Sequence, residues 1–158
     1  MPKFGYSIAA KVLEKEENNV VKGSLREVRI SPKDSIEIAR WLKGLSLVDA
    51  RERLQAVIEK KISVPYKRHN KKVPHRKDLL KYYAGRYPVK AASKVLSLVQ
   101  SMISEAENRN LDIEKLRIIH ASAYGGRKIK RYMPRAFGRA SPRFSTLTHF
   151  ELVAKEVS

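Results

Sequence analysis

Residues 116–153 read LRIIHASAYGGRKIKRYMPRAFGRASPRFSTLTHFELV, and this stretch decides the fold. Both of its ends, residues 116–124 and 145–153, are rich in β-branched and aromatic side chains, which favour strands. The roughly twenty residues between them hold three Gly and two Pro, and a structureless loop of that length is unusual inside a compact domain. We therefore predict an extended β-hairpin over 116–153, whose arms at about 3.3 Å per residue would project by about 30 Å.

Such a hairpin has no core of its own and is only marginally stable when isolated. Its side chains alternate between cations and large apolar groups, the latter being Tyr132, Met133, Phe137 and Phe144. Arginine binds phosphate through a planar fork and stacks on bases, and aromatic rings also stack on bases. The pattern predicts a ribbon that folded RNA encloses, with phosphate contacts from Arg127, Lys128, Lys130, Arg131, Arg135, Arg139 and Arg143.

Upstream of the hairpin the sequence predicts three helices. The first begins at Ser31-Pro32, with Asp34 completing a capping box, carries Ile36, Ala39 and Leu42 on one side and ends at Gly44. The second begins at Ser46, and its apolar stripe runs from Leu47 to Ile58 until Pro65 ends the helix. Pro88 opens the third, whose stripe consists of Ala91, Ala92, Val95, Leu96, Val99, Met102, Ile103 and Ala106.

Residues 25–30 alternate apolar and charged side chains and predict a short strand, and residues 1–24 are interpreted as an N-terminal arm. Together these elements predict one α+β domain over 1–158. Three helices would pack on a small antiparallel sheet, from which the long C-terminal β-hairpin protrudes.

Residues 64–87 break the helical pattern with the sequence VPYKRHNKKVPHRKDLLKYYAGRY. The segment is basic, aromatic and punctuated by Pro, so we interpret it as an extended insertion loop that faces a partner. Its candidate phosphate contacts are Lys67, Arg68, Lys71, Lys72, Arg76 and Lys77.

The charge distribution supports a polyanionic partner. The chain holds 34 Lys and Arg against 16 Asp and Glu, for a formal net charge of +18. No acid at all occurs among residues 115–150, and Asp78 is the single acid among residues 61–104. Clustered like charge repels itself, and phosphate is its natural counterpart. The absence of Cys excludes a disulfide scaffold and a thiolate metal site.

The histidines suggest no chemistry. His120 and His149 fall on strands that are expected to pair, and paired imidazoles can act as acid and base, but Glu151 is the only carboxylate nearby. We predict no catalytic residue, and interpret His149 as a phosphate contact or as a pin at the base of the hairpin. His69 and His75 lack further ligands for a tetrahedral site, so neither metal nor cofactor is expected.

Three motifs carry a family resemblance. Along the chain they are VRISPK at 28–33, KRYMPRAFGRA at 130–140 and THFELV at 148–153. In this order they closely resemble the L22 family of large-subunit ribosomal proteins over roughly residues 25–155. The FGYS segment at 4–7 and the basic insertion at 64–87 resemble the archaeal and eukaryotic branch of that family.

The resemblance implies a structural protein of the large ribosomal subunit, located in the cytoplasm and without catalytic activity. It implies that the hairpin threads through ribosomal RNA (rRNA), bridges several rRNA domains during assembly and lines the exit tunnel. The implied partners are large-subunit rRNA, neighbouring ribosomal proteins and the nascent polypeptide. The implied tunnel-lining tip comprises Arg131, Tyr132, Met133, Pro134, Arg135, Ala136, Phe137, Gly138, Arg139 and Ala140.

Two other classes of protein share the basic composition. An architectural DNA-binding protein would also use an arginine-rich ribbon, but a symmetric one needs a dimer interface, and the sequence leaves no long apolar face for one. We therefore expect no homo-oligomer. A membrane-surface protein would need cations opposite bulky apolar residues, whereas the third helix has small residues and few charges. The sequence contains no run of 18 apolar residues, so no membrane span is predicted.

Overall fold

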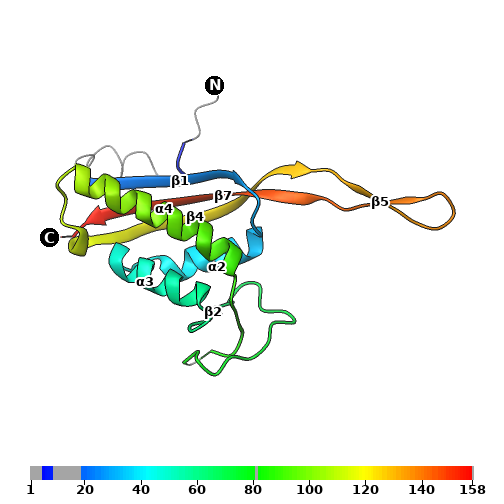
Figure 1. The fold of residues 1–158 in the computed structure, drawn as a ribbon, viewed down its shortest axis with the longest axis horizontal. Helices are drawn as coiled ribbons and strands as arrows, with labels where there is room; N and C mark the ends of the chain where they lie inside the picture. The colour runs from blue at the N-terminus through cyan, green and yellow to red at the C-terminus, as the bar shows by residue number, and fades with distance from the viewer. Residues whose placement is uncertain (1–4, 9–18, 81, 158) are drawn as a thin grey trace.

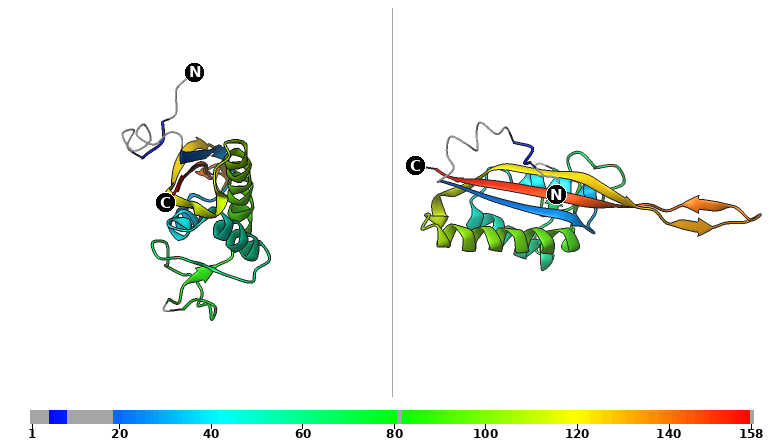
Figure 2. Two further views of the ribbon diagram at one scale, coloured as in Figure 1. Left: turned by 90° about the vertical axis from the view of Figure 1, so that its left-hand side faces the viewer. Right: turned by 90° about the horizontal axis from the view of Figure 1, so that it is seen from above.

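A three-stranded antiparallel sheet with helices on one side forms the body of the protein (Figures 1 and 2). The computed structural model describes residues 5–8, 19–80 and 82–157. The helices are α2 (Pro32–Leu42), α3 (Leu47–Ile58), α4 (Val89–Asn108) and the short 3₁₀ turn η2 (Ile113–Lys115). The strands are β1 (Val20–Val28), β2 (Val64–Pro65), β3 (Gly85–Arg86), β4 (Leu116–Ile129), β5 (Tyr132–Pro134), β6 (Ala140–Pro142) and β7 (Ser145–Glu156).

The strand order of the sheet is β1-β7-β4, so the last strand in the chain lies in the centre. Val20 pairs with Lys155 on one side, and Leu116 pairs with Glu156 on the other. The predicted α+β fold with a protruding C-terminal hairpin is confirmed. Within the described ranges no helix is long and apolar enough to cross a membrane.

The first strand begins earlier than predicted. It begins at Val20, inside the segment interpreted as an arm, and ends at Val28 rather than at residue 30. The cause is Gly23, which stands where the alternating pattern requires a large apolar residue. A Cβ on Gly23 would lie 2.8 Å from Cγ of Met102, so only glycine lets α4 approach the strand this closely. Residues 1–4 and 9–18 of the predicted arm lie outside the described residues.

The predicted helix starts are confirmed. Ser31 caps α2 and Ser46 caps α3, each hydroxyl accepting a hydrogen bond from the backbone amide three residues on. Gly44 follows α2 with a φ of 92°, the left-handed conformation expected of a terminator. The second helix ends at Ile58, well before Pro65, which belongs to strand β2.

Replacing Ser46 by Ala is expected to lower the free energy of unfolding by about 1 kcal/mol, because the Asp49 amide loses its 3.0 Å acceptor. Thermal unfolding followed by circular dichroism measures the effect as a fall in Tm of roughly 2–4 °C. Ser93→Ala, at an exposed position inside α4, is the control and should cause no loss. A Ser46→Ala protein that melts with the wild type would contradict the capping assignment.

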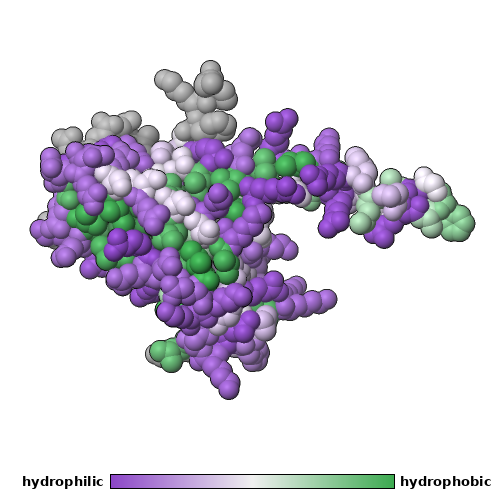
Figure 3. Space-filling view, in the orientation of Figure 1, coloured by the Kyte–Doolittle hydropathy of each residue, from purple (hydrophilic) through white to green (hydrophobic). Residues whose placement is uncertain are grey.

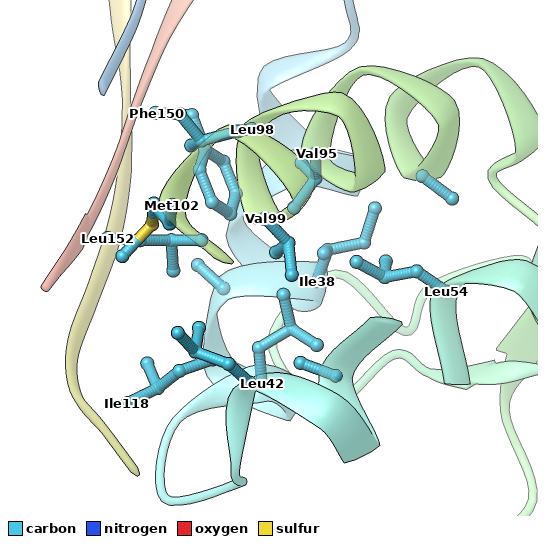
Figure 4. Packing of buried hydrophobic residues seen from close by; sticks show 14 of the residues in the cluster. Ile38, Leu42, Leu54, Val95, Leu98, Val99, Met102, Ile118, Phe150 and Leu152 are labelled. Carbon is cyan, nitrogen blue, oxygen red and sulfur yellow. The ribbon is translucent and has the colours of Figure 1, made fainter. Parts of the chain in front are cut away.

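The core lies between the sheet and the three helices (Figure 4). Phe150 and Leu152 of the central strand meet Leu98 and Met102 of α4 there. Two predicted stripes are slightly out of phase with the structure. Ile36 and Leu96 are half-buried, whereas their neighbours Ile38 and Leu98 are buried, as is the acidic residue Glu37.

Candidate nucleic-acid interface

The hairpin continues beyond the sheet as a two-stranded ribbon (Figure 1). Strand β1 pairs with β7 only as far as Thr148, whose partner on β4 is Gly125, so from there outward the ribbon has no third strand. The pairing resumes with β5 and β6, in which Tyr132 faces Pro142. This is the projecting ribbon that the sequence predicts, and its last strand extends three residues past the predicted end, to Glu156.

A β-bulge lies where the ribbon meets the body. The register shifts between Gly125 and Lys128, at the tandem glycines Gly125 and Gly126. A Cβ on Gly126 would overlap the imidazole ring of His149, so the strand can pass this ring only with glycine there. His149 is 7% exposed, its ring packs 5.2 Å from that of Tyr124, and its Nδ1 accepts a hydrogen bond from the amide of Glu27.

His149 therefore lies at the base of the ribbon with its ring largely buried, where it can act as a pin, and its predicted phosphate contact stays a prediction. His120 does not face His149 across the sheet. The residue of β4 opposite His149 is Tyr124, whereas His120 pairs with Val153. Its Nε2 lies 3.0 Å from Oγ of Ser7 and 3.8 Å from Oε2 of the buried Glu151. Burial lowers the pKa of His120, against the opposing effect of that carboxylate.

The tip is a tight turn at residues 135–139. The amide of Arg135 donates to the carbonyl of Arg139 at 2.8 Å, and the two residues at the apex, Phe137 and Gly138, both have positive φ. All ten residues from 131 to 140 are exposed, and Phe137 is 98% exposed. Figure 3 shows hydrophilic side chains along the ribbon near the body and apolar ones at the far end.

The seven predicted cations of the ribbon all point into solvent: Arg127, Lys128, Lys130, Arg131, Arg135, Arg139 and Arg143. In the described part of the chain none of them forms an ion pair with a carboxylate. Arg135 makes one neutral contact, to the hydroxyl of Ser141. Tyr132 and Phe144 form an edge-to-face pair 5.9 Å apart, and both remain partly exposed. The ribbon therefore carries concentrated positive charge that the protein itself does not neutralise.

The insertion loop is folded, which corrects the prediction of an extended segment. Its two ends pair as β2 and β3, with Val64 opposite Arg86. The turn at residues 67–69 is stabilised by Glu37 of α2. This side chain is fully buried and accepts hydrogen bonds from the amides of Lys67, Arg68 and His69 at 2.7–3.0 Å. Sequence reasoning missed this carboxylate, which stands among hydrophobic residues of α2 and shows its role only when the loop is placed beside it.

Further contacts tie the loop to the body. The hydroxyl of Tyr66 donates to Asp34 of α2 at 2.8 Å, and burial together with this carboxylate raises the pKa of Tyr66. Burial alone would raise the pKa of Asp78, but the hydrogen bonds from Ser63 and from its own backbone, together with the charge of Arg76, outweigh this effect and hold that pKa below its usual value.

Most of the candidate cations of the loop are exposed, namely Lys67, Arg68, Lys71, Lys72 and Lys77. Arg76 differs, because its guanidinium lies 4.8 Å from the centre of the Tyr87 ring and its Nε donates to the Gly85 carbonyl. The Arg76 side chain therefore makes part of its polar contacts within the loop itself.

An α+β body that presents a bare cationic ribbon and a folded basic loop defines a class of small proteins built to dock against a polyanion. Comparison with known proteins specifies the family: the profile of the family described as ribosomal protein L22p/L17e matches residues 23–155. The chain belongs to this ribosomal protein family.

Curated relatives agree over nearly the whole chain. The large ribosomal subunit protein uL22 of Archaeoglobus fulgidus is 50% identical over 140 residues, which cover 89% of this chain and 90% of the relative. The proteins of the same name from Thermofilum pendens and Aeropyrum pernix are 46% and 43% identical and cover 99% of this chain. The resemblance to the L22 family is thereby confirmed, and so is its archaeal character.

Proposed function

We propose that the chain is a structural constituent of the large ribosomal subunit that binds large-subunit rRNA through its ribbon and its insertion loop. The observation that carries this proposal is the ribbon beyond Gly125 and Thr148, which bears seven exposed cations without a carboxylate partner in the described structure. A two-stranded ribbon is marginal alone. RNA phosphates would supply both the missing counter-charge and the missing packing. The family to which the chain belongs supports this partner.

The shape of the molecule supports the proposal that it bridges rRNA domains. The ribbon and the insertion loop leave the body in different directions (Figures 1 and 2), so they can contact RNA segments that lie far apart. A rigid protein that binds two such segments fixes their relative position, which is the task of an assembly factor that stays in the finished particle.

We further propose that residues 131–140 line the exit tunnel, and that the nascent polypeptide and neighbouring ribosomal proteins are the other partners. The full exposure of the tip and the apolar side chains of Met133 and Phe137 suit contact with a passing peptide of varied sequence. The role is structural rather than catalytic, and its place is the cytoplasmic ribosome.

Sedimentation tests this function. A lysate of the source organism is separated on a sucrose gradient at native salt, and the chain is quantified by mass spectrometry in each fraction. We expect one copy per large subunit, and we expect it to remain bound when the subunits are washed in high salt. Salt screens exposed charges, but it does not release a ribbon that is enclosed by RNA. A chain found at the top of the gradient, or released at modest salt, would overturn the enclosed-ribbon proposal.

A further inference from the structure

One face of α2 presents cations that sequence reasoning did not single out. Lys33 and Arg40 stand seven residues apart on α2, which places them on the same side of the helix, and Lys43 follows as the residue that caps its C-terminus. All three side chains are exposed. The signal that could have found them is this spacing, but its meaning depends on what lies beside the helix.

The acids of the same helix are engaged by residues of the insertion loop. Asp34 receives the hydroxyl of Tyr66 at 2.8 Å, and Glu37 is buried with its carboxylate shared among three loop amides. A helix that is nearly balanced in sequence therefore shows an excess of positive charge to its surroundings.

Two hollows flank this face and share one residue. The first, of about 390 Å³, lies between the start of α2 and the insertion loop. The second, of about 260 Å³, lies between α2 and strand β4, along residues 121–123, which are Ala, Ser and Ala. Arg68 lines both hollows, so the two are neighbours along one path. The small side chains of β4 leave room for a polymer backbone to approach the sheet closely.

The lining of the path is suited to phosphate. Its cations are Lys33, Arg40, Lys43, Arg68, Lys71 and Arg86, against the single acid Asp34.

We propose that these two hollows form one continuous track for the sugar–phosphate backbone of a single RNA strand. The strand would run from the insertion loop, along α2, to the base of the ribbon. This inference rests on the proposed binding of rRNA and adds to it a third contact surface, which joins the other two. Recognition is of backbone charge rather than of base sequence, because the path offers cations and no aromatic platform beyond Tyr66, which is buried.

The salt dependence of binding measures this surface directly. Large-subunit rRNA transcribed in vitro serves as the probe, and the dissociation constant is measured against salt concentration. Each phosphate contact contributes about 0.7–0.9 to the slope of log K against log salt. The variant Lys33→Gln/Arg40→Gln/Lys43→Gln is expected to reduce the magnitude of that slope by about two units.

The matched control is Arg51→Gln/Lys60→Gln/Lys90→Gln, which removes the same charge from exposed positions on α3, in the turn that follows α3 and on α4. It should leave the slope close to that of the wild type. If the α2 variant behaves like this control while a ribbon variant weakens binding, the track is refuted and the proposed function stands. If the wild-type chain does not bind this rRNA, both proposals fail together.

Directed cleavage tests whether the path is continuous. The chain contains no Cys, so single variants Asn70→Cys and Ser122→Cys provide unique attachment points for an iron chelate, one in each hollow. In reconstituted subunits, hydroxyl radicals from both sites should cut the same rRNA strand a few nucleotides apart. Ser97→Cys on exposed α4 is the control. Cuts from the two sites in unrelated rRNA segments would overturn the single-strand track.

Discussion

Replacing Arg131, Arg135 and Arg139 together by Glu is expected to exclude the protein from large subunits while its melting temperature stays unchanged. The three side chains are exposed and in the described structure they form no ion pair, so the fold loses only the exposed hydrogen bond of Arg135 to Ser141. In the RNA each arginine–phosphate hydrogen bond contributes about 1.5–3 kcal/mol, so losing three of them weakens docking by a factor on the order of 1,000 or more. Repulsion between the new carboxylates and phosphate weakens it further.

The measurement compares the tagged variant with the tagged wild type, expressed together with the native protein, by their occupancy of purified large subunits. Arg51→Glu/Lys60→Glu/Lys90→Glu controls for the change in net charge and should be incorporated normally. Should the ribbon variant reach wild-type occupancy, docking of the ribbon in RNA would have to be abandoned.

The second large effect concerns Glu37. Replacing it by Ala removes the acceptor of three backbone amides, those of Lys67, Arg68 and His69. An unsatisfied buried donor costs about 1–3 kcal/mol, so the expected loss in the free energy of unfolding is about 4 kcal/mol. The corresponding fall in Tm is roughly 10 °C. Hydrogen exchange should locate the damage in residues 64–87, whose amides would exchange faster.

Two comparisons sharpen this prediction. Glu37→Gln keeps an acceptor oxygen without the charge and should fall between wild type and Glu37→Ala. Glu52→Ala changes an exposed position on α3, and its free energy of unfolding should stay within about 0.5 kcal/mol of the wild-type value. Equal melting of the Glu37 and Glu52 variants would mean that the loop is held by its other contacts alone.

The ribbon and the three helices could be predicted from sequence because their signals are local. Branched and aromatic residues flank a Gly- and Pro-containing centre in the hairpin, and Ser31, Ser46 and Pro88 mark the helix starts. The tight turn at 135–139 lies inside the predicted tip. In each case neighbouring residues determine the structure, so no distant part of the chain needs to be known.

The misplaced features depend on contacts between distant segments. Gly23 hides the strand pattern of β1 because its partner is Met102 of α4. The insertion loop looks extended until Glu37, some thirty residues earlier, is placed beneath it. The cationic face of α2 acquires its meaning only when Arg68 and strand β4 are set beside it. Side chains that act across the fold carry little signal in their immediate sequence.

The position of β7 in the centre of the sheet has a consequence for the order of folding during synthesis. Strand β1 pairs with β7, and β4 pairs with it from the other side, so neither has its sheet partner until residues 145–156 have been made. Helices can form as they emerge, but the sheet closes only after them, through contacts of high sequence separation. Until residues 145–156 have been made, the chain is therefore an open, strongly cationic polymer, a state in which early pairing with RNA competes with completion of its own core.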